Sequence, residues 1–264
     1  MAVKIFDEFK ENLNKGFPVA LATIIEGPGQ GAKLLLLPDG SYLGSLGNEK
    51  INNVLSRDMA GELAAGRTSI RHYGIEGEAR EETLSIFIES FAPPPQMVIF
   101  GAVDFTAALV RIAKVLGYKV IVCDARPVFA TKARFPQADS VENEWPDQLM
   151  EKLGTSLGPR DAVCVLTHDN KFDVPAITSA LQTQVGYIGV MGSRKTHENR
   201  TERLIEAGVT TKEFERVMSP IGLDLGARTP EETAISICAE IIAMRTGRKA
   251  PHLKTIEGAI HGDR

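Results

Sequence analysis

One segment joins a glycine-serine turn to two cations at the start of a predicted helix. Gly192 and Ser193 follow the apolar run 187–190, and the helical pattern opens with Arg194 and Lys195. Cations in a first turn oppose the helix dipole and cost roughly a few tenths of a kcal/mol. Unpaired backbone N–H groups at the same place attract anions, and residues that break a local rule tend to mark function. The segment therefore predicts an anion-binding site, with a solvated helix start as the alternative.

A second turn only partly matches a dinucleotide fingerprint. Gly101 fits its first glycine after the apolar run 97–100, but Val103 stands where the second glycine lets the backbone approach a pyrophosphate. Asp104 adds an anion in the first helical turn, where the phosphates of the ligand would lie. Asp124, at the end of the next apolar run, stands about where a ribose-binding acid belongs. The position favours a nucleotide, whereas the loop disfavours NAD(P).

Other polar residues near strand ends allow two interpretations each. Arg126 either accepts a phosphate or pairs with Asp124 at the surface. Asp224, between two leucines of a glycine-containing loop, either caps local amides or faces a ligand. His168 follows another apolar run and is more typical of a hydrogen-bonded loop residue than of a ligand-contacting one. We find no nucleophile elbow, H-E-x-x-H or phosphate-loop signature and no zinc-ligand spacing, so we predict neither a catalytic residue nor a metal site.

A proline-rich connector divides the elements that must position these residues. We predict a linker at 92–96, with an N-terminal domain over 1–91 and a second domain over 97–264. In the second domain, short apolar runs alternate with helical patterns, which predicts a Rossmann-like parallel sheet with right-handed crossovers. The predicted strands are 97–100, 120–123, 162–166 and 187–190, and the predicted helices cover 105–116, 145–153, 174–182 and 194–207.

The first half predicts a smaller α+β domain, because an opening helix is followed by strand patterns and turns. Its predicted strands are 18–25, 33–37 and 83–91, with a helix over 56–65. The fold class is therefore α/β, with a Rossmann-like parallel sheet in the C-terminal part. The last helix begins with a capping box at Thr229 and carries Cys238 on its packing stripe, which predicts a core position for that thiol.

Composition limits the classes of partner. The chain has 264 residues, of which 43% are hydrophobic and 24% charged, as in ordinary globular proteins. Its net charge of −4 lacks the basic surplus that nucleic-acid binding needs. Three scattered cysteines favour a reducing compartment, and we find neither a membrane span nor a signal sequence. We therefore predict a cytoplasmic protein that binds neither nucleic acid nor membrane.

Several of these motifs together resemble the XdhC/CoxI family of accessory proteins for molybdenum hydroxylases. The resemblance covers most of 97–246 and is looser in the first half. It rests on the segments 122–127, 134–139, 188–194 and 220–232.

The resemblance implies a chaperone and not an enzyme. Members bind the molybdenum cofactor (molybdopterin) as cargo, shelter it while a cysteine desulfurase supplies its sulfido ligand, and deliver it to a xanthine dehydrogenase-type apoenzyme. The cofactor's phosphate would then meet the turn at 192–195, and its pterin would use the two acids at 124 and 224. The expected cofactor-binding residues are Gly101, Asp124, Arg126, Gly192, Ser193, Arg194, Lys195 and Asp224.

Two departures from the family pattern keep other functions in view. Many members carry a Gly-Gly-Cys segment in the first half, but here Ser45-Leu-Gly47 takes its place and no cysteine precedes Cys123. A thiol contact to molybdenum from that loop is impossible. Val103 departs from the usual Gly-Ala-Gly turn. The alternatives are an NAD(P)-binding oxidoreductase and a divergent scaffold paralogue, and a homodimer is a weaker expectation.

Overall fold

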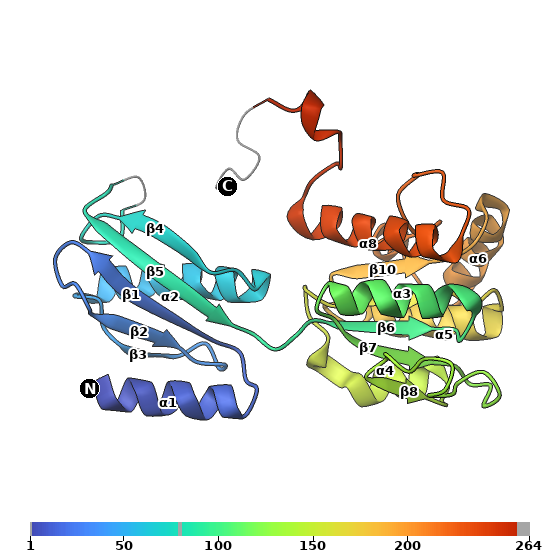
Figure 1. The fold of residues 1–264 in the computed structure, drawn as a ribbon, viewed down its shortest axis with the longest axis horizontal. Helices are drawn as coiled ribbons and strands as arrows, with labels where there is room; N and C mark the ends of the chain where they lie inside the picture. The colour runs from blue at the N-terminus through green and yellow to red at the C-terminus, as the bar shows by residue number, and fades with distance from the viewer. Residues whose placement is uncertain (1, 79–80, 258–264) are drawn as a thin grey trace. The chain divides into compact units, whose positions relative to one another are not determined.

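The computed structural model describes residues 2–78 and 81–257 and divides the chain into two compact units. One unit ends at Pro93, and the other begins at Pro94. Figure 1 labels the main helices and strands of both units. The first strand of the second unit starts at Gln96, inside the segment predicted as a linker. Within the described residues, no helix is long and apolar enough to cross a membrane.

The N-terminal unit is built on a five-stranded antiparallel sheet with the order β3-β2-β1-β5-β4. Two hydrophobic clusters form on its opposite faces because alternate residues of a strand point to opposite sides. Ala20 and Ala22 of β1 pack with α2, whereas Val19 packs with α1. The elements are α1 (Ala2–Asn14), β1 (Val19–Glu26), β2 (Lys33–Leu36), β3 (Tyr42–Gly44), α2 (Glu49–Ala65), β4 (Ser69–Tyr73) and β5 (Leu84–Phe91).

The C-terminal unit holds a six-stranded parallel sheet with the order β11-β10-β9-β6-β7-β8, so the predicted Rossmann-like architecture is confirmed. Its first elements are β6 (Gln96–Phe100), α3 (Asp104–Val115), β7 (Lys119–Cys123), β8 (Ser140–Glu142) and α4 (Pro146–Leu153). They are followed by β9 (Ala162–Val165), α5 (Asn170–Leu181), β10 (Tyr187–Val190), α6 (Arg194–Glu206), α7 (Thr211–Phe214), β11 (Val217–Met218) and α8 (Pro230–Thr246).

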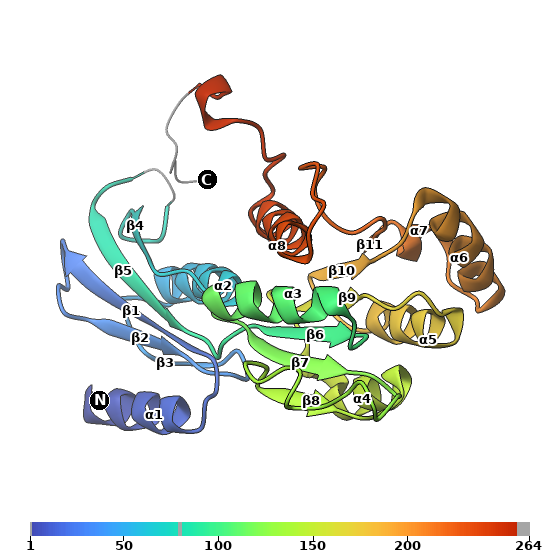
Figure 2. The ribbon, with the colours of Figure 1, turned by 45° about the vertical axis from the view of Figure 1, so that its right-hand side comes forward.

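Helices cover both faces of this sheet, which explains why its central strands read as continuous apolar runs. Met97 and Ile99 of β6 pack on the side of α3 and α8, whereas Val98 and Phe100 pack on the side of α4 and α5 (Figure 2). Cys238 of α8 belongs to the first of these clusters, which confirms its predicted core position. The predicted capping box of that helix is also confirmed.

Short or polar elements differ most from the predictions. The helix predicted over 56–65 is α2, which begins seven residues earlier because the side chain of Asn48 accepts a hydrogen bond from the Ile51 N–H, 3.1 Å away. Strand β4 reads Ser-Ile-Arg-His-Tyr and so lacks an apolar run. Strands β3, β8 and β11 have three, three and two residues, which is too short for a clear periodic pattern.

A glycine in β10 lets the loop after β11 pack onto the sheet. An added Cβ at Gly189 would lie 2.5 Å from Cδ1 of Ile221, a distance that real Cβ atoms essentially never show. Ile221 also donates its backbone N–H to the Val190 carbonyl at 3.0 Å. Close packing of the segment that follows β11 therefore depends on the missing side chain.

We predict that Gly189→Ala lowers the free energy of unfolding by about 1–3 kcal/mol, because the extra methyl group overpacks a buried site. The control is Gly158→Ala in the same unit, where the nearest atom would be an ordinary 3.9 Å away. Urea denaturation followed by circular dichroism measures both. Equal destabilisation by the two substitutions would contradict this account of Gly189.

Candidate functional site

The loops that follow the parallel strands meet at one edge of the sheet. From β6 the chain proceeds outward through β7 and β8, and it then returns to the other side of β6 for β9, β10 and β11. The strand order therefore reverses between β6 and β9. Open α/β sheets bind ligands in the crevice outside the carboxyl ends of the strands at such a switch point.

Gly101 brings the loops after β6 and β9 into contact at this switch point. Its φ is +109°, a conformation that L side chains rarely adopt. An added Cβ would lie 2.7 Å from Cγ2 of Thr167 and 3.0 Å from that residue's backbone nitrogen. Only glycine fits both the conformation and the space, so this predicted site residue has a clear structural requirement.

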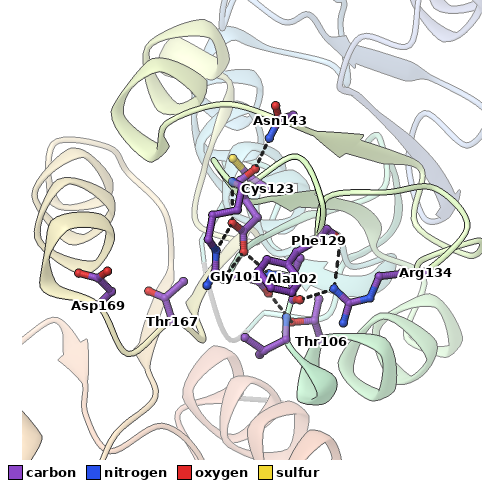
Figure 3. A network of polar contacts seen from close by, with 12 residues as sticks. Gly101, Ala102, Thr106, Cys123, Phe129, Arg134, Asn143, Thr167 and Asp169 are labelled. Atoms are coloured by element: carbon purple, nitrogen blue, oxygen red, sulfur yellow. Dashed lines mark hydrogen bonds and ion pairs between the residues drawn. The ribbon is translucent and has the colours of Figure 1, made fainter.

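Asp124 is buried at the same edge, and its carboxylate is fully engaged. Oδ1 accepts hydrogen bonds from N and Nε of Arg126, both at 2.9 Å. Oδ2 accepts from Nη2 of Arg126 and from the backbone N–H of Ala102, both at 2.8 Å. The side-chain amide of Asn143 donates to the Asp124 carbonyl at 2.8 Å. Figure 3 shows polar contacts at this edge, with Ala102, Asn143 and Thr167 among the labelled residues.

The environment of Asp124 favours its charged form. Burial alone raises the pKa of the carboxyl, but the hydrogen bonds from Arg126 and Ala102 outweigh burial and hold the pKa below its usual value. Arg126 and Asp124 do form an ion pair, which was one of the two interpretations of Arg126. However, only 1% of the Asp124 side chain is exposed, so the pair is anchored in the interior and not on the surface.

Two arginines lie over aromatic rings at this edge. The guanidinium carbon of Arg126 is 4.5 Å from the ring centre of Phe129 and 5.8 Å from that of Phe172. Arg134 lies 5.5 Å from the Phe129 ring and donates to the Ala102 carbonyl at 2.9 Å. Stacking on a ring fixes the orientation of a guanidinium and leaves its charge available at the edge.

The loop after β6 uses its own backbone donors internally. The N–H of Gly101 donates to the Cys123 carbonyl at 2.8 Å, and the N–H of Val103 donates to Oγ1 of Thr106 at 3.3 Å. The N–H of Ala102 is held by Asp124, as described above. All three amides of the turn therefore have protein acceptors, unlike the free amides of a dinucleotide-binding turn.

A buried ion pair that we did not predict lies on the other side of the switch point. Only 1% of each side chain is exposed, and Nη2 of Arg200 lies 2.8 Å from Oδ2 of Asp173. Thr167 donates to the other carboxylate oxygen. Burial raises the pKa of Asp173, while Thr167 and Arg200 oppose that rise. The sequence signal was a charged residue within the apolar pattern of α5.

Arg200 also connects the strand ends around the predicted anion site. Its Nη2 donates to the Met191 carbonyl at 2.9 Å, and its Nη1 donates to Oγ of Ser219 at 3.4 Å. These contacts join α6 to the turn after β10 and to the segment after β11. The backbone of the turn containing Gly192 is therefore fixed by a side chain of the helix that it precedes.

Four of the remaining predicted site residues lie in the turn at the start of α6. Helix α6 begins at Arg194, as predicted, directly after Gly192 and Ser193. The side chains of Arg194 and Lys195 lie outside the described part of the structure.

Asp224 is exposed and makes no hydrogen bond or ion pair with the described residues, so the structure does not join it to the Asp124 network. His168 is exposed after β9, and the neighbouring Asp169 caps α5 by accepting a hydrogen bond from the Lys171 N–H at 3.1 Å.

The cysteines are poorly suited to bind a metal. Cys123, Cys164 and Cys238 are all buried. Burial raises the pKa of Cys123 and of Cys238 to about 12, and it also raises the pKa of Cys164 well above its ordinary value. A thiol must lose its proton to become a strong ligand. Among the described residues, no group of three or more His, Cys, Asp or Glu side chains is arranged to hold a metal ion.

Fold and site together define a Rossmann-type α/β domain with arginines at its carboxyl edge, preceded by a small antiparallel α+β unit. Residues 97–241 match the XdhC Rossmann domain, and residues 13–74 match the XdhC and CoxI family. The chain therefore belongs to the XdhC/CoxI family, as the resemblance in its motifs predicted.

Individual relatives agree with this assignment. The chain is 36% identical over 165 residues, 62% of its length, to a probable xanthine dehydrogenase subunit of Bacillus subtilis. It is 25% identical over 162 residues, 61% of its length, to the molybdenum cofactor insertion chaperone PaoD of Escherichia coli. These matches cover 47% and 44% of the two relatives, so the chain spans less than half the length of either.

A solved structure supports the fold over nearly the whole chain. The crystal structure of a xanthine dehydrogenase from Bacillus halodurans superposes with a TM-score of 0.55 and 22% sequence identity. The alignment covers 93% of this chain and 97% of that one. At this identity the likeness concerns the fold alone.

We predict that Arg200→Met lowers the free energy of unfolding by about 3–5 kcal/mol, because it leaves the Asp173 charge buried without a partner. The double variant Asp173→Asn/Arg200→Met should be more stable than Arg200→Met alone, because the second change removes that charge. Arg203→Met, at an exposed position of the same helix, is the control and should change stability by less than about 0.5 kcal/mol. Chemical denaturation decides, and additive losses in the double variant would contradict the prediction.

The lowered pKa of Asp124 predicts a pH dependence of stability. Because its pKa is lower in the folded state than in the unfolded chain, the carboxylate stabilises the fold above the unfolded-state pKa, about 4. This contribution is lost as the pH falls through the folded-state pKa. Asp124→Asn should therefore cost about 1–3 kcal/mol at neutral pH, and its difference from wild type should shrink in acid.

Denaturant unfolding at pH 7 and at about pH 3 measures this difference. Asp224→Asn, which changes an exposed acid of the same unit, should match wild type at both pH values. A difference between wild type and Asp124→Asn that stays constant with pH would show that the folded-state pKa of Asp124 is not lowered.

Proposed function

We propose that the protein is an accessory chaperone that binds the molybdenum cofactor and supports its insertion into a xanthine dehydrogenase-type molybdenum hydroxylase. The observation that carries this proposal is the family membership, which spans the Rossmann domain and the N-terminal module. The names of two relatives, a molybdenum cofactor insertion chaperone and a xanthine dehydrogenase subunit, support the same role. In this role the protein carries a cargo and catalyses no reaction of its own.

The geometry of the carboxyl edge suits an anionic cargo. Helix α6 starts directly after the turn at the end of β10, and its first turn contains no acidic residue. The backbone N–H groups of that first turn lack intrahelical acceptors, so they and the positive end of the dipole favour the cofactor's phosphate. We assign the phosphate to Gly192, Ser193, Arg194 and Lys195.

For the pterin ring the structure suggests a revised set of partners. The carboxylate of Asp124 already accepts four hydrogen bonds, so it supports the site without an acceptor to spare. Arg126 keeps 43% of its side chain exposed, and Asp224 is exposed in its loop. We propose that Arg126 and Asp224 contact the cofactor, that Asp124 holds Arg126 in place, and that Gly101 lets the loops after β6 and β9 approach each other.

The chaperone role extends to two partners and to an oligomeric state. We propose that the cofactor is held here while a cysteine desulfurase supplies its sulfido ligand, and that the loaded protein then docks on the apoenzyme. Because the thiols of this chain are buried, the cargo is held by charge and hydrogen bonding. A cytoplasmic homodimer remains part of the proposal, and sedimentation of the purified protein tests the dimer.

We predict that the wild-type protein binds molybdenum cofactor with micromolar or tighter affinity, about −8 kcal/mol. Arg194→Ala/Lys195→Ala should weaken binding at least about tenfold, because it removes two cations from the phosphate site. Anaerobic equilibrium binding measures both, with NADPH titrated in parallel. The matched control is Arg203→Ala/Lys212→Ala, which removes two exposed cations from other turns of the same unit and should bind like wild type.

The two ligands separate the rival functions. Binding of NADPH with no binding of the cofactor would replace the chaperone by the oxidoreductase alternative. Binding of neither ligand would favour a divergent scaffold. Equal loss of cofactor in the control pair would show that the effect comes from total charge and not from the start of α6.

A further inference from the structure

The acid that stands where nucleotide-binding Rossmann domains hold the ribose is already occupied by a side chain. A ribose-binding acid accepts hydrogen bonds from the hydroxyl groups of the sugar. A carboxylate offers about four acceptor positions, and in Asp124 all four are filled. Three of the donors belong to Arg126 and the fourth is the Ala102 amide, at 2.8–2.9 Å. A nucleotide would find no free acceptor there.

The Arg126 guanidinium also lies near the loops that follow the neighbouring strands. It starts from the loop after β7, and its guanidinium approaches Phe172 of α5, the helix that follows β9. In the sheet, β7 and β9 lie on either side of β6. Its Nη2 and the N–H of Ala102 also share Oδ2 of Asp124, so the guanidinium lies beside the loop that follows β6.

We propose that Arg126 is a specificity-determining residue that excludes nucleotides from this Rossmann domain by occupying their ribose acceptor. Its guanidinium makes the two side-chain hydrogen bonds that a ribose diol would make, in the bidentate geometry that arginine and carboxylate prefer. In place of a carboxylate that could accept hydrogen bonds from sugar hydroxyl groups, the site presents the positively charged guanidinium of Arg126. The position that holds a ribose in nucleotide-binding domains therefore favours an anionic group here.

The exclusion reaches the phosphate turn through Asp124. Oδ2 of Asp124 accepts hydrogen bonds from both the Arg126 guanidinium and the backbone N–H of Ala102. The same oxygen therefore has no acceptor left for a ribose and keeps one amide of the turn from a phosphate. Replacing the Arg126 side chain frees one acceptor position on each carboxylate oxygen, whereas the backbone N–H groups of residues 102 and 126 keep their hydrogen bonds. Val103 is a second, separate obstacle at the approach of the pyrophosphate.

The test compares Val103→Gly with Val103→Gly/Arg126→Ala. Both variants lack the Val103 side chain that blocks a pyrophosphate, so the comparison measures the effect of Arg126 alone. The probe is ADP-ribose, which carries the ribose and pyrophosphate of NAD without the nicotinamide, and calorimetry of the full-length protein is the readout. We expect the double variant to bind ADP-ribose at least about tenfold more tightly. Adding Asp124→Asn should abolish this gain, because the gain depends on the freed carboxylate.

Two controls keep the test decisive. Arg134→Ala in the Val103→Gly background removes an arginine that contacts the same Phe129 ring but does not touch Asp124, and it should give no gain. Thermal melting checks the fold of every variant. If Arg126→Ala unfolds the domain, Arg126→Lys is tested instead, because its single ammonium group cannot fill both carboxylate oxygens in the same way and should still raise affinity.

Equal affinity with and without Arg126, or no binding of ADP-ribose by any folded variant, would overturn the inference. So would a gain that persists in the Asp124→Asn background. The inference does not rest on the proposed cargo. Loss of cofactor binding on changing Arg194 and Lys195 tests the chaperone proposal, whereas the ADP-ribose series tests only the acceptor at Asp124, so the two can fail separately.

Discussion

A buried carboxylate must be neutralised where it lies, and this constraint organises the carboxyl edge of the Rossmann sheet. Asp124 and Asp173 stand on either side of the switch point, and each is held by one arginine. Because an unpaired charge in the interior is far more costly than a paired one, each arginine has little freedom to move. The two arginines differ in burial: Arg200 is enclosed and joins three segments, whereas Arg126 keeps part of its surface in solvent.

Because of this difference in burial, only Arg126 can reach a molecule outside the protein. Arg200 is buried and holds the backbone of the turn before α6, so its role is structural. Arg126 is equally fixed by the Asp124 carboxylate, but 43% of its side chain is exposed, and its guanidinium lies near two aromatic rings. A cation that is oriented in advance loses little entropy when an anion binds. The ion pair that neutralises Asp124 therefore also holds a partly exposed cation in a fixed orientation at this edge.

The fold could be predicted wherever burial produced a continuous pattern. Strand β6 is covered on both faces, so its residues form an apolar run. Strand β4 has one exposed face and several polar residues, so its sequence does not show a strand pattern. The candidate site could be predicted only in part. Asp124 was found from its place after a strand, but the saturation of its carboxylate depends on side-chain geometry. Asp173 and Arg200 are 27 residues apart, and only the packing of α5 against α6 brings them together.

The starts of α6 and α8 carry opposite charges in their first turns. Helix α8 satisfies its own first turn: Thr229 accepts from the Glu232 amide, and acids stand at the positive end of the dipole. Helix α6 begins with two basic residues and has no acid in its first turn. The dipole would favour an anion at this end of the helix, and a departure from the usual rule for helix starts is the kind of local inconsistency that tends to mark functional sites.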